Sequence, residues 1–284
     1  MPSKIILYGI KSGKKWLKSA PATAIEQTVN ITLVQYAPQW EDAPYNLRRL
    51  SDMLHPLSGA TDMILLPEMW STGFSMNVGH VAGFSAGTLS WMREMAGRSG
   101  AMVTGTMPVE INHRYYNRMY WVSPEGNTGY YDKRHLFGLS DESTCFTPGR
   151  QRCRFSWKGW EICPVVCYDL RFPAWCRNTK DRPYDLLICP ASWPSARSDV
   201  WKTLLKARAL ENQCFVAGVN RVGTDNNGLP HQGESSVYGP KGELIGRLPE
   251  NEESVTTFHL SLPELNSFRE KFAVLNDMDS LSFL

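Results

Sequence analysis

The stretch Trp160-Glu-Ile-Cys-Pro-Val-Val-Cys-Tyr-Asp-Leu-Arg-Phe-Pro173 indicates both the fold and the chemistry of this chain. Its first seven residues are mostly apolar, which predicts a buried strand over 160–166. The strand stops at Cys167. A cysteine that leaves a buried strand into a tight turn projects its sulfur above the sheet, as the nucleophile does in a strand–turn–helix elbow. We therefore expect a reactive thiol at a strand end.

Two other segments have the same form, an apolar strand followed at once by a reactive side chain. Leu65-Leu-Pro-Glu68 places a carboxylate after a strand, and Tyr130-Tyr-Asp-Lys133 places an amine after another. Strand ends are where α/β folds hold their ligands. The sequence therefore predicts that Glu68, Lys133 and Cys167 share one site.

These three residue types form a chemically consistent set. A thiolate attacks a carbonyl carbon, a carboxylate takes the thiol proton and returns it to a leaving amine, and an ammonium stabilises the oxyanion. Each side chain also has a structural alternative. Glu68 could be a solvated loop residue, Lys133 a surface charge, and Cys167 an inert core cysteine.

The rest of the chain alternates between strand and helix patterns. Leucines at helical spacing predict a helix over 46–57, and further helices are expected over 88–98 and 199–213. This interleaving favours one α/β domain with mixed sheets covered by helices. Apolar runs and turn signals predict strands over 31–36, 63–66, 101–107, 115–122, 128–132, 154–157, 160–166, 186–189, 215–220, 235–238, 243–247 and 255–260.

Composition excludes several classes of protein. The chain has 284 residues, 42% of them hydrophobic, and a net charge of +2, so we expect no nucleic-acid partner. No apolar run exceeds about four residues, against the roughly 20 that a membrane span needs, so no membrane partner is expected. The seven cysteines are odd in number and lie in apolar segments. That pattern favours a reducing, cytoplasmic location over a disulfide scaffold.

Residues 1–29 differ from the remainder. Five lysines precede the first acidic residue, Glu26, and the first arginine is Arg48. We expect a flexible N-terminal extension over 1–29 and one catalytic domain over 30–284. A mitochondrial-type leader is the alternative, although such leaders favour arginine.

With their flanks, the three segments resemble the signature motifs of the nitrilase superfamily of carbon–nitrogen hydrolases. The matching residues are Leu-Pro-Glu68, Tyr-Asp-Lys133-Arg-His-Leu-Phe and Val-Cys167-Tyr-Asp-Leu-Arg-Phe-Pro. The resemblance implies a four-layer α-β-β-α sandwich and a Glu68–Lys133–Cys167 catalytic triad. It also implies a supporting glutamate, which Glu142 matches, no metal or cofactor, and a homodimer.

Within that superfamily, four further segments resemble the bacterial ω-amidases: Trp70-Ser-Thr-Gly-Phe74, Cys189-Pro-Ala-Ser-Trp-Pro194, Ala207-Arg-Ala-Leu-Glu-Asn-Gln213 and Val219-Asn-Arg-Val-Gly223. The resemblance implies hydrolysis of the terminal amide of α-ketoglutaramate or α-ketosuccinamate. The products are the 2-oxo diacid and ammonia.

Several roles follow for the residues around the triad. The backbone N–H of Tyr168 is expected to join Lys133 in stabilising the oxyanion. Because the substrate carries a carboxylate, Arg171 and Arg197, which follow strand ends, are the candidate cations. The aromatic side chains expected to wall the pocket are Trp70, Phe74 and Trp193.

Other interpretations remain open at this point. The same triad would serve an N-carbamoyl amidase, an aliphatic amidase or a nitrile hydrolase, and the scaffold could carry a non-catalytic binding protein. His135 could act as the base of a Cys–His hydrolase, although a structural role beneath the lysine segment is favoured. Metal-ligand spacing is absent, so no zinc site is expected.

Overall fold

The computed structural model describes residues 28–279, and the predicted extension over 1–29 lies almost wholly outside this part of the chain. Two six-stranded sheets form the centre of the molecule. The first sheet has the order β14-β1-β2-β3-β4-β5. Its strands are β14 (Ser254–Ser261), β1 (Thr28–Gln35), β2 (Met63–Leu65), β3 (Met102–Ile111), β4 (Arg114–Val122) and β5 (Thr128–Asp132).

The second sheet repeats this plan with the order β13-β12-β9-β8-β7-β6. A separate hairpin pairs β10 (Val222–Thr224) with β11 (Pro230–Gln232). The strands of the second sheet are β13 (Leu244–Arg247), β12 (Ser236–Tyr238), β9 (Phe215–Asn220), β8 (Leu186–Ala191), β7 (Trp160–Pro164) and β6 (Phe155–Trp157).

Strand direction brings the predicted site residues to one edge. β1, β2 and β3 are parallel, as are β7, β8 and β9. β4 is antiparallel to β3, and β5 is antiparallel to β4, so β5 again runs with β2. The residues that follow β2 and β5, Glu68 and Lys133, therefore emerge at the same edge of the first sheet.

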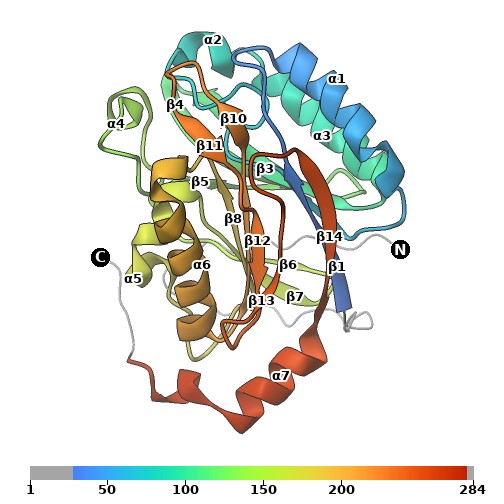
Figure 1. The fold of residues 1–284 in the computed structure, drawn as a ribbon, viewed down its shortest axis with the longest axis vertical. Coiled ribbons are helices and arrows are strands. Elements are labelled where there is room, and N and C mark those ends of the chain that lie inside the picture. The colour runs from blue at the N-terminus through green and yellow to red at the C-terminus, as the bar shows by residue number, and fades with distance from the viewer. Residues whose placement is uncertain (1–27, 280–284) are drawn as a thin grey trace.

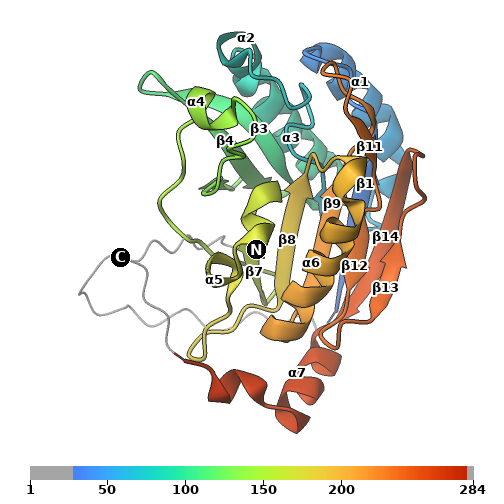
Figure 2. The same cartoon turned by 60° about the vertical axis from the view of Figure 1, so that its left-hand side comes forward.

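Helices cover the outer faces of both sheets, which gives the predicted four-layer α-β-β-α sandwich (Figure 1). α1 and α3 lie side by side over the first sheet, and α6 crosses the second sheet over β8, β9 and β12 (Figure 2). The helices are α1 (Ala43–Leu54), α2 (Val78–Ala82), α3 (Ser85–Ser99), α4 (Glu142–Cys145), α5 (Pro173–Cys176), α6 (Ser198–Asn212) and α7 (Leu262–Lys271).

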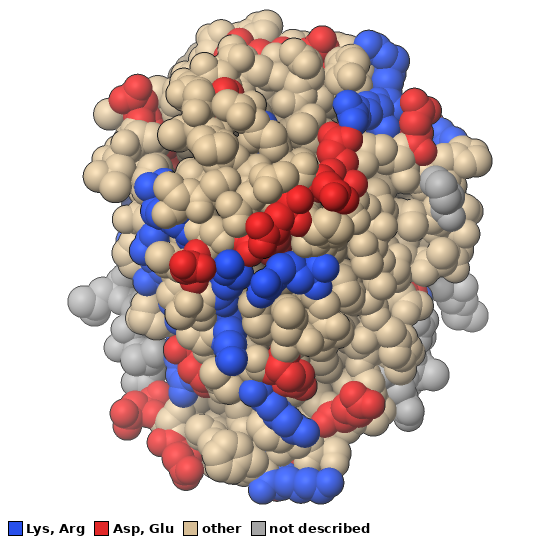
Figure 3. Space-filling view, in the orientation of Figure 1, with Lys and Arg blue, Asp and Glu red and all other residues tan. Residues whose placement is uncertain are grey.

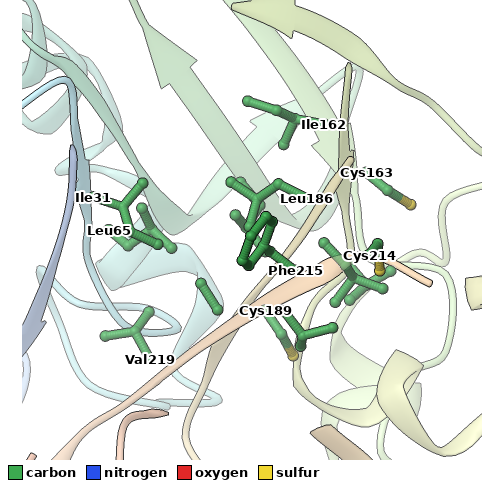
Figure 4. Packing of buried hydrophobic residues seen from close by; sticks show 14 of the residues in the cluster. Ile31, Leu65, Ile162, Cys163, Leu186, Cys189, Cys214, Phe215 and Val219 are labelled. Carbon is green, nitrogen blue, oxygen red and sulfur yellow. The ribbon is translucent and has the colours of Figure 1, made fainter. Parts of the chain in front are cut away.

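The main core fills the space between the sheets. One buried cluster joins the two sheets: it contains Leu65 of β2, Leu186 of β8 and Phe215 of β9 (Figure 4). Trp121 of β4 stacks on Phe155 of β6, with ring centroids 4.2 Å apart. Truncating one of these large side chains to alanine costs roughly 2–5 kcal/mol, because the surrounding core cannot close the cavity.

α6 packs unusually close to its sheet at Gly218. A Cβ atom there would lie 2.7 Å from Leu205 and from Trp201, both buried on α6. Glycine at this strand position therefore lets the helix approach β9. That helix in turn supports the strands that end at the site.

The predicted strands and long helices are confirmed, with shifted ends. α1 begins at Ala43 rather than Asn46, because the Asp42 side chain accepts a hydrogen bond from the Tyr45 N–H and caps the helix there. Lys158 and Gly159 both have positive φ and form the predicted tight turn between β6 and β7. The short helices α2, α4 and α5, the helix α7 and the β10–β11 hairpin were not predicted.

Charged side chains of both signs lie among wide uncharged areas on the face that Figure 3 shows. In residues 28–279, no helix is long and apolar enough to cross a membrane. All seven cysteines are free thiols.

Candidate active site

Cys167 sits on a strained turn shortly after β7, the second-sheet strand next to the edge strand β6. Its φ is +44°, in the left-handed region that a residue other than glycine adopts only where its surroundings enforce it. The 3-10 helix Cys167–Arg171 begins at this residue. The sulfur lies 4.0 Å from the carbonyl oxygen of Ser192 and faces the pocket described below. The predicted elbow is therefore present.

Glu68 lies on a second sharp turn, in which the next residue, Met69, has a φ of +47°. The Met69 N–H donates to Thr106 Oγ1 at 2.8 Å, which fixes the turn against β3. The Glu68 carboxylate is buried and accepts three hydrogen bonds. Lys133 Nζ and Asn117 Nδ2 each lie 2.8 Å from Oε1, and the Ser192 N–H lies 3.0 Å from Oε2.

Lys133 follows β5 and points its ammonium between two carboxylates. Nζ lies 2.8 Å from Glu68 Oε1 and 2.8 and 2.9 Å from the two oxygens of Glu142. All three side chains are fully buried. The backbone of Lys133 is held by Asn117 on one side and by Gly149 on the other. Such a rigid cluster positions the ammonium to within a fraction of an ångström.

Glu142 begins α4, a one-turn helix (Glu142–Cys145). Besides Lys133, its carboxylate accepts from the Phe137 N–H at 2.6 Å and from Asn117 Nδ2 at 3.0 Å. The structure therefore gives the predicted supporting glutamate, Glu142, direct contact with Lys133.

Two carboxylates around one ammonium give this buried cluster a net negative charge. Burial raises the pKa of the Glu68 carboxyl. The positive charge of Lys133 lowers this pKa, and the negative charge of Glu142 raises it further. Burial would lower the pKa of Lys133, but the charges of Glu142 and Glu68 outweigh it and raise that pKa above its usual value. Burial and the Glu68 charge raise the pKa of the Cys167 thiol. At rest the cluster therefore holds a neutral thiol beside a base.

Asp169 joins the elbow to the lysine segment. Its buried carboxylate accepts from the Val166 N–H at 3.0 Å and from the Tyr131 hydroxyl at 2.7 Å. It also accepts from the His135 N–H at 2.8 Å, and His135 Nδ1 lies 2.7 Å away. The His135 ring stacks on Phe172 with centroids 3.7 Å apart. His135 thus has a structural position, as favoured above, and its ring bonds to Asp169.

The three candidate catalytic residues meet at a pocket of about 420 Å³, which Cys167 and Lys133 line. The predicted Phe74, Trp193, Tyr168, Arg171 and Arg197 also line it. The Tyr168 ring packs edge-on against Phe137 and Phe172, which holds its backbone next to the sulfur. The pocket is large enough for a small aliphatic amide with room to spare.

Besides Lys133, two arginines, Arg171 and Arg197, line the pocket wall. The Arg171 guanidinium lies 5.2 Å from the Trp193 ring centre, and that of Arg197 lies 5.2 Å from the ring centre of Phe137. Among residues 28–279, neither arginine has a carboxylate within ion-pair distance. Both remain available to an anionic ligand.

The prediction that Trp70 walls the pocket is wrong. Trp70 is fully buried and packs on Trp91 of α3, with ring centroids 5.0 Å apart. The turn at Met69 directs the following side chain away from the site and into the core under α3.

Sequence reasoning missed three residues that contact the cluster. Asn117 donates to both Glu68 and Glu142, Ser192 holds Glu68 through its backbone, and His231 lines the pocket and contacts Ser192. Asn117 carried a detectable signal. It shares the inward face of β4 with Met119 and Trp121, where a polar side chain needs a buried partner.

In the described part of the chain, no group of three or more His, Cys, Asp or Glu side chains is placed to hold a metal ion. The cluster's own groups supply a nucleophile, a base and a cation, so none of the chemistry derived below is assigned to a metal.

The four layers, together with a buried thiol, carboxylate and ammonium at one sheet edge, define a nitrilase-superfamily hydrolase. A model of the carbon–nitrogen hydrolase family matches residues 30–270. The chain belongs to this family, whose members hydrolyse carbon–nitrogen bonds.

Individual relatives are similar over nearly their whole length. Omega-amidase YafV of Escherichia coli strain K12 is 41% identical over 251 residues, covering 88% of this chain and 97% of the relative. The 2-oxoglutaramate amidase of Bacillus subtilis strain 168 is 33% identical, covering 87% and 96%. A superfamily protein of Xanthomonas campestris, solved with an arsenic adduct in its active site, superposes with a TM-score of 0.88. It is 41% identical, and the match covers 90% of this chain and 99% of the solved chain.

Proposed function

We propose that this protein is an ω-amidase that hydrolyses the terminal amide of a 2-oxo acid amide, α-ketoglutaramate or α-ketosuccinamate. One observation carries the proposal. The Cys167 thiol and the Glu68–Lys133–Glu142 cluster lie at a pocket whose wall holds two arginines without carboxylate partners. Similarity to relatives named omega-amidase and 2-oxoglutaramate amidase supports the choice of substrate.

The first half of the reaction forms a thioester. Glu68 takes the thiol proton of Cys167, and the thiolate attacks the amide carbonyl carbon. Lys133 and the Tyr168 backbone N–H stabilise the oxyanion. When the intermediate collapses, the carbon–nitrogen bond breaks and protonated Glu68 gives its proton to the leaving nitrogen. Ammonia leaves, and the acyl group stays on Cys167.

The second half releases the acid. Glu68, ionised again, removes a proton from water, and the resulting hydroxide attacks the thioester carbonyl. The same cations stabilise the second oxyanion. The carbon–sulfur bond then breaks, and Glu68 returns the proton to the sulfur. The net reaction converts one amide and one water into a carboxylic acid and ammonia, and no cofactor takes part.

The pocket wall provides for the other end of the substrate. A 2-oxo acid amide carries a carboxylate beside its ketone, several bonds away from the amide. Arg171 and Arg197 supply cations that can bind this carboxylate in a bidentate manner. Phe74 and Trp193 also line the pocket and offer apolar surface to the methylene groups of the substrate.

A substrate panel tests the proposal. Ammonia release is measured with α-ketoglutaramate, α-ketosuccinamate, an N-carbamoyl amine, a simple aliphatic amide and a nitrile. The proposal expects the two 2-oxo acid amides to have the highest kcat/KM. Preference for the carbamoyl amine, the aliphatic amide or the nitrile would contradict it, because all these reactions use the same triad and differ only in the far end of the substrate.

The assembly and location belong to the same proposal. A homodimer is expected from the family resemblance, and the free thiols of all seven cysteines fit a reducing cytoplasm. Sedimentation of the purified chain tests the dimer, and a monomer at micromolar concentration would contradict it.

A further inference from the structure

Ser192 connects the general base to the nucleophile through its backbone. It follows β8 directly, so it lies at the same strand edge as Cys167. Its N–H donates to Glu68 Oε2 at 3.0 Å, and its carbonyl oxygen lies 4.0 Å from the Cys167 sulfur. Any shift of this one peptide segment changes the hydrogen bonding of both groups.

The side chain of Ser192 is anchored by His231 of the β10–β11 hairpin. His231 Nε2 lies 3.3 Å from Ser192 Oγ, and both residues are buried. On the other side of the ring, Nδ1 lies 3.0 Å from the Leu229 carbonyl oxygen. Because a carbonyl only accepts, Nδ1 carries the proton and Nε2 is free to accept from the Ser192 hydroxyl.

The surroundings keep this imidazole neutral. Burial, with the nearby Arg221 guanidinium, lowers the pKa of His231 to about 4, against a smaller opposing effect of Asp225. Arg221 is itself buried, and its described hydrogen bonds include no carboxylate partner. A neutral ring has one donor and one acceptor nitrogen, so with Nδ1 donating to the Leu229 carbonyl, Nε2 is the acceptor for the Ser192 hydroxyl.

The neighbouring residue of the same segment is clamped from β9. Asn220 Oδ1 accepts from the Trp193 N–H at 2.8 Å, and Asn220 Nδ2 donates to the Trp193 carbonyl at 3.0 Å. The segment after β8 is therefore held at Trp193 by Asn220 and at Ser192 by His231. Of these two contacts, the His231 contact is the one next to the catalytic cluster.

We infer that His231 is a positioning residue for the reaction: by accepting a hydrogen bond from the Ser192 hydroxyl, it fixes the backbone segment that contacts both Glu68 and Cys167. This inference rests on the proposed amidase function. His231 lines the pocket as well, so a direct substrate contact is the competing role. If His231 is a positioning residue, its replacement should lower kcat. If it contacts the substrate, its replacement should raise KM.

The test compares His231→Leu, His231→Gln, Ser192→Ala and the double variant His231→Leu/Ser192→Ala, with exposed His55→Leu as the control. His231→Gln keeps an acceptor near the Nε2 position, whereas His231→Leu does not. Ser192→Ala removes the hydroxyl that anchors the segment and keeps the backbone N–H and carbonyl groups themselves. Steady-state kcat and KM are measured with α-ketoglutaramate, and the rate of Cys167 alkylation by iodoacetamide is measured against pH.

The inference predicts that His231→Leu and Ser192→Ala each lower kcat roughly three- to tenfold, the effect of one hydrogen bond, with KM little changed. The kcat of the double variant should be no lower than the kcat of either single variant. His231→Gln should restore most of the rate. Alkylation in the two impaired variants should require a higher pH, because a loosened Ser192 N–H stabilises ionised Glu68 less.

Additive losses in the double variant, a change in KM alone, or wild-type kcat in His231→Leu would each overturn the inference. If His231→Leu does not fold, Ser192→Ala and His231→Gln still decide it, since the first should be impaired and the second active. If wild-type protein releases no ammonia from any ω-amide, the proposed function fails separately. The alkylation profile would still test the positioning role.

Discussion

The Tyr131 hydroxyl donates a hydrogen bond of 2.7 Å to Asp169 Oδ2, and this contact ties the strand that precedes Lys133 to the turn that starts at Cys167. Tyr131 belongs to β5 of the first sheet, and Asp169 lies in the 3-10 helix that follows β7 of the second sheet. Trp175 Nε1 donates to the same hydroxyl at 2.8 Å. The distance between the nucleophile and the oxyanion cation is therefore set by a buried hydrogen-bond network as well as by strand packing.

Asp169→Asn should disturb this network while keeping the volume. An amide can replace only one of the two carboxylate oxygens as an acceptor, and its NH2 group would face a donor such as the Val166 N–H. We expect a loss of about 1–3 kcal/mol in the free energy of unfolding and a lower kcat. Urea unfolding and steady-state kinetics measure these effects, and unchanged stability would contradict the role given to Asp169.

Glu142→Gln should impair turnover through Lys133. The ammonium would keep only Glu68 as a charged partner, so the two would pair more tightly and Glu68 would become a weaker base. We expect kcat to fall by about 10²-fold, a typical effect of losing one general acid–base contribution. Exposed Glu94→Gln on α3 is the control. A wild-type kcat in Glu142→Gln would show that Lys133 does not need its second carboxylate.

The acidic limb of the pH–rate profile should report Glu68. The base acts only when ionised, so activity falls as the pH drops through its pKa, which burial raises above 4.5. Asn117→Asp replaces a donor to Glu68 with a third buried carboxylate, which should raise that pKa further. We expect the limb of kcat/KM to move to higher pH by about one unit. The control, Asn276→Asp on the surface, should leave the acidic limb at its wild-type pH. If the limb does not move in Asn117→Asp, Glu68 is not the group that causes it.

The arginines on the pocket wall should act on substrate affinity. Arg171→Met or Arg197→Met keeps much of the side-chain length and loses the charge. If either guanidinium binds the substrate carboxylate, its removal should raise KM for α-ketoglutaramate by roughly 10–100-fold, the contribution of one charged hydrogen bond. The KM for a neutral amide such as propionamide should rise far less. Equal increases in KM for both substrates would indicate that the arginine stabilises the fold of the pocket and does not bind the carboxylate.

Sequence patterns were informative wherever a residue stood next to a strand end. Glu68, Lys133 and Cys167 each follow an apolar run, and the direction of parallel strands then brings such residues together. The order of the strands was not accessible in this way. β14 pairs with β1 although more than two hundred residues separate them, and only the packed sandwich sets that pairing.

Contacts made through backbone atoms left no trace in the sequence. Ser192 holds Glu68 by its N–H, which any residue other than proline possesses, so the side chain gave no warning. Trp70 shows the reverse error. A large aromatic close to the motif suggested a pocket wall, but the positive φ of Met69 turns the chain and directs Trp70 into the core. His231 was one of six scattered histidines until the hairpin placed it beside Ser192.

The central claim is that the amide is cleaved through a thioester on Cys167. The most direct measurement is peptide mass analysis of enzyme quenched with acid during turnover of α-ketoglutaramate, for the wild type and for Cys167→Ala. We predict an acyl adduct on the wild-type peptide that contains Cys167, and a folded Cys167→Ala protein that has no adduct and no ammonia release above background. Ammonia release by Cys167→Ala, or an adduct on another residue, would contradict the account.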